Sequence, residues 1–174
     1  IKAFYETFKN KTKKPALILK TSQVGSSYMD RDEILRKINL IKQTVNSDDL
    51  PNVYLLHGEF SDKEMNSIYN HSKVKAMVSF TKGEGFGRPL LEFSLSKKPI
   101  IVSGWSGHMD FLSKRNTVLL PGGLADVQAG SFQDGLHVEG QKWFTVDYQG
   151  AVRLMKDVKI NYRKHKLNAK KLAK

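Results

Sequence analysis

Short apolar runs alternate with amphipathic segments along the chain. Runs such as Val53–His57 and Pro99–Val102 lack a clean apolar–polar alternation, which is typical of strands buried on both faces. Between them, residues 30–45 repeat isoleucine at helical spacing, and we expect Asp30 to cap this helix. The pattern predicts strands at 16–20, 53–57, 76–80, 99–102 and 117–120, and helices at 1–8, 30–45, 61–69, 88–95, 107–112, 147–158 and 160–174.

Strands that are separated by helices pair in parallel, and right-handed crossovers then place the helices on the faces of the sheet. The sequence therefore predicts an α/β fold with a Rossmann-like, doubly wound and mostly parallel sheet. Ser61 and Glu64 have the spacing of a capping box at the start of one helix. Residues 121–146 are rich in Gly, Gln and Asp, and we expect an irregular insertion there. We expect one domain over residues 1–158, followed by a basic helix over 159–174.

A glycine-rich turn, Thr81-Lys82-Gly83-Glu84-Gly85-Phe86-Gly87, joins the third predicted strand to a helix that opens with Arg88-Pro89. Ligands of such sheets bind at the carboxyl ends of the strands, which is where this turn lies. Its glycines allow a ligand to approach the backbone closely, and Pro89 suits the first helical position. We expect the amides of Gly87, Arg88 and Leu90 to face an anion such as a diphosphate, assisted by the helix dipole.

Charged side chains flank this turn. Arg88 either adds a bidentate contact to the phosphates or faces solvent. We expect Glu92 in the first turn of the helix, where its carboxylate is able to accept hydrogen bonds from the vicinal hydroxyls of a ribose. Glu84 precedes the Gly85-Phe86-Gly87 part of the turn, and we expect it to face the sugar side of the same ligand. Taken singly, each glutamate is also compatible with an ordinary surface carboxylate.

The run Glu84-Gly85-Phe86-Gly87-x-Pro89-x-x-Glu92 resembles the Glu-x7-Glu motif of retaining glycosyltransferases with the GT-B fold, in the large "glycosyl transferases group 1" family. Residues 57–69 and 98–102 are similar to the segments before and after that motif in the family. Residues 104–110 lie at the place of its Gly-Gly-x-x-Glu loop, with Asp110 where Glu is usual. Trp143 and Asp147 resemble the start of a late helix. The resemblance covers residues 1 to about 158.

The resemblance implies a role for each matched residue. Glu92 would bind the ribose of a nucleotide diphosphate sugar, and Gly85, Phe86 and Gly87 would face the diphosphate and the sugar. Glu84 would be the catalytic carboxylate, supporting charge at the anomeric carbon, while the departing phosphate deprotonates the acceptor. Additional donor-binding candidates are Thr81, Lys82 and Arg88, followed by Gly107, His108, Asp110 and Lys20. His108 is also compatible with a structural role. No cofactor and no metal ion is required.

The family places an Arg and a Lys that clamp the diphosphate before the helix at residues 1–8, and an amino-terminal domain that holds the acceptor. We therefore expect this chain to be the donor-binding half of a longer enzyme and to be inactive alone. Two alternatives stay open: a nucleotide-sugar epimerase of the same fold, and a non-catalytic module that binds a nucleotide or an anionic surface. Sugar transfer by the full-length protein separates the enzyme classes, and nucleotide binding separates both from the module.

The formal charge of +12 is concentrated at the two ends of the chain. Such a charge favours anionic partners, and an anionic membrane surface is one candidate, although a solvated helical face explains the same pattern. Nucleic acid is not expected, because no aromatic-interleaved motif accompanies the charge. The chain contains no cysteine, which excludes disulfides and thiolate metal sites. We expect a cytoplasmic location, with or without peripheral contact to a membrane.

Overall fold

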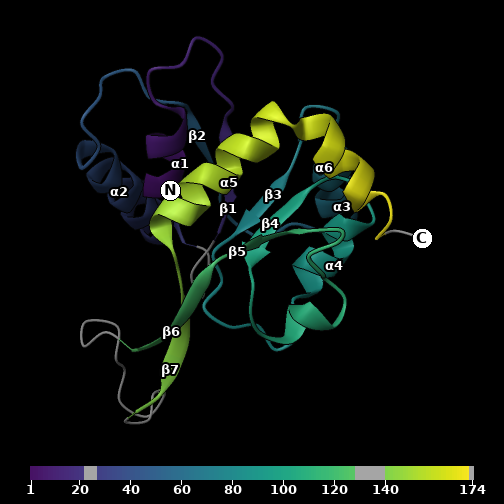
Figure 1. The fold of residues 1–174 in the computed structure, drawn as a ribbon. Coiled ribbons are helices and arrows are strands. Elements are labelled where there is room, and N and C mark those ends of the chain that lie inside the picture. The colour runs from purple at the N-terminus through teal and green to yellow at the C-terminus, as the bar shows by residue number, and fades with distance from the viewer. Residues whose placement is uncertain (22–26, 128–139, 173–174) are drawn as a thin grey trace. The chain divides into compact units, whose positions relative to one another are not determined.

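The computed structural model describes residues 1–21, 27–127 and 140–172. The chain divides into two compact units, residues 1–67 and 68–174, and each unit is described by itself. Both contain helices and parallel strands (Figure 1). The α/β class predicted from the sequence is therefore confirmed.

The first unit is built around a two-stranded parallel sheet. Its elements are α1 (Lys2–Phe8), β1 (Leu17–Lys20), α2 (Tyr28–Gln43) and β2 (Val53–Leu56). The register places Leu17 opposite Val53. Phe4 and Phe8 are one helical turn apart on α1, and their rings pack edge to face with centroids 5.0 Å apart. The next helix, α3 (Asp62–Asn70), contains the boundary between the two units.

The predicted cap of α2, Asp30, lies three residues after the observed one. Ser27 is the N-cap, and its Oγ accepts a hydrogen bond from the N–H of Asp30 at 3.2 Å. The Asp30 side chain is instead buried, and its carboxylate lies 2.6 Å from Nε2 of His57. A serine, which the sequence interpretation did not consider, therefore supplies the cap in place of the predicted aspartate.

The capping box at the start of α3 is confirmed. Glu64 accepts a hydrogen bond from the N–H of Ser61 at 2.8 Å, and the N–H of Glu64 donates to the Ser61 hydroxyl at 3.3 Å. The two bonds satisfy donors that a helix start otherwise leaves without partners. The hydrogen bonds from Ser61 also lower the pKa of the Glu64 carboxyl.

The second unit has a three-stranded parallel sheet in the order β3 (Met77–Ser79), β4 (Ile100–Ser103) and β5 (Val118–Leu120). The central strand β4 is buried along its whole length, as its apolar sequence predicts. The helical segments of this unit beyond α3 are α4 (Arg88–Ser94), the 3-10 turn η1 (Gly107–Asp110), α5 (Tyr148–Ile160) and α6 (Tyr162–Ala169). Phe93, Leu112 and Leu120 form part of its core.

An antiparallel hairpin follows β5. Its strands are β6 (Gly122–Asp126) and β7 (Lys142–Val146), and Gly122 pairs with Val146. Figure 1 shows the hairpin extending away from the three-stranded sheet. The prediction of an irregular segment at 121–146 was therefore wrong at both of its ends, while its middle part, 128–139, lies outside the described residues. Sequence reasoning missed the hairpin because β6 is exposed throughout and carries no apolar–polar alternation.

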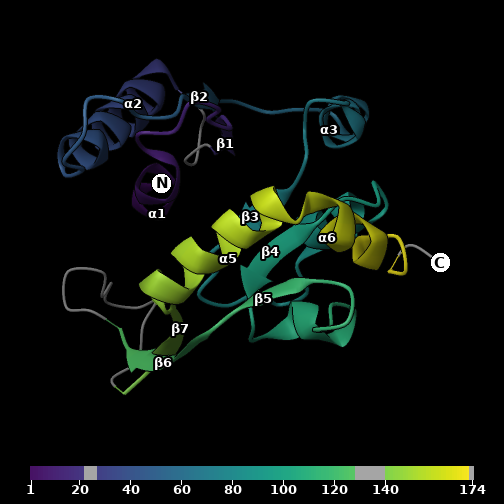
Figure 2. The same cartoon turned by 45° about the horizontal axis from the view of Figure 1, so that its top comes forward.

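Two helices complete the second unit, as Figures 1 and 2 show. Asp147 caps α5, as predicted, by accepting a hydrogen bond from the N–H of Gln149 at 3.0 Å. The predicted basic helix begins at Tyr162 rather than Ile160, because the chain leaves helical angles at Asn161. The side chains of Asn161 and His165 each lie 2.6 Å from the Asp157 carboxylate.

The parallel strands fall into one two-stranded and one three-stranded sheet. A single doubly wound sheet, as a GT-B half would have, therefore stays a prediction. The same is true of the domain boundaries at residues 1–158 and 159–174. The described fold is sufficient to position the glycine-rich turn, because strand, turn and helix all belong to the second unit.

Candidate functional site

The glycine-rich turn begins at the carboxyl end of β3, where two neighbouring segments hold it. The Ser103 hydroxyl, at the end of β4, donates to the Thr81 carbonyl at 2.7 Å. The Phe144 N–H, on β7, donates to the Lys82 carbonyl at 3.0 Å. Thr81 closes the first bend itself, since its hydroxyl oxygen accepts from the N–H of Gly83 at 3.3 Å and the hydroxyl donates to the Gly83 carbonyl at 3.0 Å.

Glu84 is held through its backbone by the loop that follows β4. The N–H of Glu84 donates to the Ser106 hydroxyl oxygen at 2.9 Å, and that hydroxyl donates to the Glu84 carbonyl at 2.8 Å. The N–H of Gly107 donates to the same carbonyl at 3.1 Å. Because these three bonds use only backbone atoms of Glu84, they leave its half-buried carboxylate available to a ligand.

The next residues present backbone N–H groups without internal partners. Among the described residues, none accepts a hydrogen bond from the N–H of Gly85, Phe86 or Gly87. Gly87 has φ 85° and ψ 46°, a left-handed conformation that glycine adopts at little cost. Three successive N–H groups on a turn bounded by glycines form a surface for hydrogen bonds to an anion.

Three expectations about α4 were wrong. The Leu90 N–H is not available to a ligand, because it donates to the Gly87 carbonyl at 2.9 Å. Glu92 is the fifth residue of the helix and lies in its second turn, and Pro89 is at the second rather than the first position. The helix begins at Arg88, as predicted, and counting from that residue makes Pro89 its second and Glu92 its fifth position. The helix has only seven residues, so the loop N–H groups, and not a long helix dipole, are what this turn offers to an anion.

Arg88 and Glu92 form an ion pair across one turn of α4. Nε of Arg88 lies 2.6 Å from Oε1 of Glu92, and the two side chains are 69% and 37% exposed. An exposed pair at this spacing contributes only about 0.3–0.5 kcal/mol. A ligand that offers hydroxyl groups to Glu92 and phosphate oxygens to Arg88 is therefore able to replace the pair at small cost. Sequence reasoning treated the two residues separately, although their spacing of four is typical of such pairs.

His108 is fully buried beneath the turn. Its Nε2 lies 2.7 Å from the Ser103 carbonyl, to which it donates. Its Nδ1 is buried and has no partner among the described residues. A side chain at Gly87 would have its Cβ 3.1 Å from the His108 Cβ, so the two residues pack closely. His108 therefore supports the turn, while Asp110, two residues later at the end of η1, is exposed.

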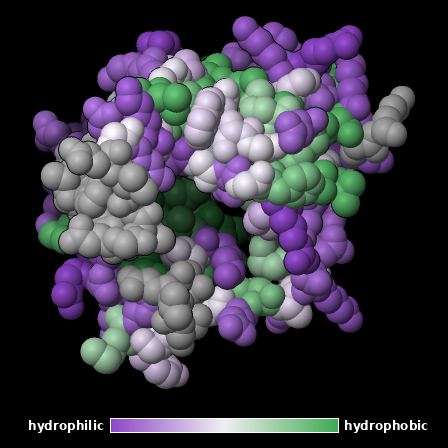
Figure 3. Space-filling view, turned by 90° about the horizontal axis from the view of Figure 1, so that it is seen from below, coloured by the Kyte–Doolittle hydropathy of each residue, from purple (hydrophilic) through white to green (hydrophobic). Residues whose placement is uncertain are grey.

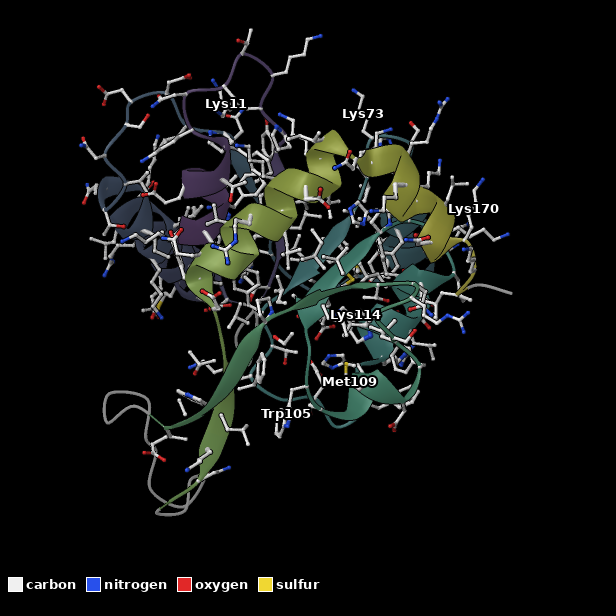
Figure 4. All side chains as sticks on the ribbon, viewed as in Figure 1. Lys11, Lys73, Trp105, Met109, Lys114 and Lys170 are labelled. Atoms are coloured by element: carbon white, nitrogen blue, oxygen red, sulfur yellow. The ribbon has the colours of Figure 1, made fainter. Side chains whose placement is uncertain are left out.

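Aromatic side chains surround the turn. Lys82 Nζ lies 3.0 Å from the centroid of the Trp143 ring, and burial lowers the pKa of its ammonium group. Trp105 and Phe144 stack with centroids 6.3 Å apart, and Figure 4 labels Trp105 on the loop after β4. Phe86 is half exposed. Figure 3 shows one face of the molecule, on which hydrophobic side chains reach the surface between hydrophilic ones. The Trp143–Lys82 contact was missed because it joins residues far apart in the sequence.

Most of the predicted site residues lie in the second unit, and one of them, Lys20, lies in the first. Those in the second unit include Thr81, Lys82, Glu84, Gly85, Phe86, Gly87, Gly107 and His108. Gly107 contacts Glu84 and Gly85, and His108 packs against Gly87. Lys20 belongs to the first unit, where its Nζ lies 5.6 Å from the Phe60 ring centroid, and its phosphate contact stays a prediction. Among the described residues, no group of His, Cys, Asp and Glu side chains is arranged to hold a metal ion.

Cationic side chains gather on the last two helices and the segments beside them. Nζ of Lys98 donates to the carbonyls of Tyr69 and His71 at 2.6 and 2.8 Å. Burial lowers the pKa of Lys98, and the charges of Lys75 and Lys166 lower it further. Residues 148–172 contain Arg153, Lys156, Lys159, Arg163, Lys164, Lys166, Lys170 and Lys171 against Asp157 as the single acidic residue.

Exposed apolar side chains accompany this charge, since Ile160 and Leu167 are 68% and 55% exposed. Figure 4 labels Lys170, the residue that follows the end of α6. Among the described residues, none of the helices combines the length and apolar character that a membrane-spanning helix needs.

Comparison with models of known protein families gives no match, and comparison with curated proteins gives none either. The resemblance to retaining glycosyltransferases therefore rests on the sequence motif around Glu84 and Glu92 and on the segments that flank it.

Proposed function

We propose that the second unit binds a nucleotide diphosphate sugar and belongs to a retaining glycosyltransferase. The observation that carries the proposal is the turn over residues 84–87, in which three N–H groups without internal partners lie between two carboxylates. A diphosphate provides the acceptors for such N–H groups, and the ribose and the sugar provide hydroxyl donors for carboxylates. One ligand of this class satisfies both requirements.

Each residue then has a separate task. The N–H groups of Gly85, Phe86 and Gly87 bind the diphosphate. Glu92 exchanges its bond to Arg88 for the ribose hydroxyls, and Arg88 turns to the phosphates, with a bidentate guanidinium contact. The cost is small, because the ion pair is exposed.

Glu84 faces the donor sugar, where a negative charge stabilises the positive charge that develops at the anomeric carbon. In the reaction, the bond from the anomeric carbon to the phosphate oxygen breaks, and a bond to the acceptor oxygen forms on the same face of the sugar. The acceptor proton passes to the departing phosphate, so the step needs no metal, no cofactor and no base from the protein.

Calorimetric titration of the chain with UDP, GDP and ADP tests the proposal. We expect one of them to bind with 1:1 stoichiometry and Glu92→Ala to weaken that binding at least tenfold, since two charge-assisted hydrogen bonds are lost. Glu59→Gln is the matched control, because Glu59 is an exposed glutamate of the first unit. Equal affinities for wild type and Glu92→Ala would remove the ribose assignment.

A second variant probes the approach of the ligand to the backbone. A Cβ at Gly85 meets no atom within 4 Å, so Gly85→Ala leaves the fold intact. We expect this methyl group to stand between the loop and the diphosphate and to weaken binding. If Gly85→Ala binds as wild type does, the ligand does not lie against this turn. If no nucleoside diphosphate binds at all, the glycosyltransferase and epimerase readings both fail, and the non-catalytic alternative is left with the basic surface.

A further inference from the structure

Ser106 has a backbone conformation that is normally reserved for glycine. Its φ of 94° and ψ of −173° lie in a region where a Cβ atom is strongly disfavoured. Gly104 and Gly107 lie on either side of it in the same loop, yet the residue with the unfavourable angles is the serine. Such a conformation persists only where the surrounding structure holds it, and observed cases cluster at functional sites.

The contacts of Ser106 show what holds it. Its hydroxyl is both acceptor and donor for one residue, Glu84, at 2.9 and 2.8 Å. These two bonds occupy both backbone polar groups of Glu84, which directly precedes the three unpartnered N–H groups. Gly107 adds a third bond and packs so closely that a Cβ there would lie 1.9 Å from the Gly85 carbonyl oxygen. A glycine at position 106 would remove the strain and, with it, the hydroxyl.

We propose that Ser106 is a positioning residue that holds the Glu84–Gly87 turn in its ligand-binding conformation, and that the strain at Ser106 is retained for this purpose. The inference rests on the proposed function, because it assigns the ordered turn to ligand binding. Ser106 itself need not touch the ligand. It acts by directing the Glu84 carboxylate and the three following N–H groups before the ligand arrives, which lowers the ordering cost of binding.

Two substitutions separate strain from positioning. Ser106→Ala removes both hydrogen bonds and keeps the unfavourable backbone, whereas Ser106→Gly removes the bonds and relieves the backbone. We therefore expect the glycine variant to melt at a higher temperature than the alanine variant, the reverse of the usual order for these two residues. Both variants are expected to bind the nucleoside diphosphate about tenfold more weakly than wild type.

Ser96→Ala is the matched control, because the buried Ser96 hydroxyl has no partner among the described residues. It should keep wild-type affinity. Hydrogen exchange gives a readout without ligand: the N–H groups of Glu84 and Gly107 should exchange faster in both Ser106 variants. Wild-type affinity in both variants would overturn the positioning role. An alanine variant more stable than the glycine variant would refute the claim that the backbone of Ser106 is strained. Absence of nucleotide binding by the wild type, with the stability order and exchange as expected, instead refutes the proposed function.

Discussion

Gly107 lies where the loop after β4 packs against the glycine-rich turn, and the substitution Gly107→Ala tests this contact by adding one methyl group. A Cβ at this position would lie 1.9 Å from the Gly85 carbonyl oxygen and 2.9 Å from the Glu84 carbonyl oxygen, whereas ordinary contacts begin at 3.4 Å. All the crowded atoms are backbone, so no side-chain rotation relieves the overlap. The Gly107→Ala variant must move the turn by more than about 1 Å, as overpacked positions force backbone shifts.

The magnitude follows from three contributions. Overpacking costs roughly 1–3 kcal/mol, and weakening the Gly107 N–H bond to Glu84 costs about 1 kcal/mol. The backbone of Gly107 is not at positive φ. Alanine therefore also stabilises the folded state by about 0.5–1 kcal/mol, because it reduces the conformational entropy of the unfolded chain. We expect Gly107→Ala to lower the free energy of unfolding by about 2 kcal/mol and to weaken nucleoside diphosphate binding at least tenfold.

Urea unfolding followed by tryptophan fluorescence measures this effect. Both tryptophans, Trp105 and Trp143, belong to the second unit, so the signal reports on the unit that carries the turn. Gly123→Ala is the control, since a Cβ there meets no atom within 4 Å and the backbone is likewise not at positive φ. If both variants unfold at the same urea concentration, the close packing of the loop against the turn is refuted.

Three further predictions use other parts of the second unit and the basic surface. Leu112→Ala should lower the free energy of unfolding by about 3 kcal/mol in the same urea assay, because Leu112 is fully buried; a change below about 1 kcal/mol contradicts its place in the core. Hydrogen bonds, first from Asn161 and then from His165, lower the pKa of the Asp157 carboxyl. Its contribution to stability is therefore fully present above the unfolded value near 3.8 and is lost as pH falls through the lower folded pKa. The difference in melting temperature between wild type and Asp157→Asn should shrink as the pH is lowered below 3.8, and a constant difference argues against this linkage. Vesicles containing phosphatidylglycerol should bind the chain in low salt, and Lys170→Glu should weaken that binding about fivefold. Lys11→Glu is the control and should leave the binding unchanged, and binding that is insensitive to salt would exclude the electrostatic contact.

The sequence was most informative where structure depends on neighbouring residues. The capping box at Ser61 and Glu64 and the cap at Asp147 have the predicted hydrogen bonds, because a cap involves residues two or three positions apart. The cap of α2 shows the limit of this reasoning. Ser27 and Asp30 both carry side chains able to cap, and the choice depended on His57, a residue 27 positions further on that binds Asp30.

Contacts between distant segments were not predictable in the same way. The β6–β7 hairpin lacks a period-two pattern, since its first strand is exposed on both faces, so its existence and its bond to Lys82 are tertiary facts. Glu92 was placed one turn too early although the start of α4 at Arg88 was predicted correctly, because Arg88 is itself the first helical residue and Glu92 is then the fifth. The partnership of Arg88 with Glu92 follows from that start and from their spacing.

From the sequence alone came the alternation of strands and helices, the position of the turn at the end of a strand, and the glutamates on either side of Gly85-Phe86-Gly87. These depend on hydrophobic periodicity and on local backbone preferences, which short stretches of chain contain in full. Only the tertiary structure decided that Ser106, with unfavourable backbone angles, holds Glu84 from 22 positions away. No local preference indicates such a bond, because the angles of Ser106 are adopted against its own preference and are stabilised only when the two loops meet.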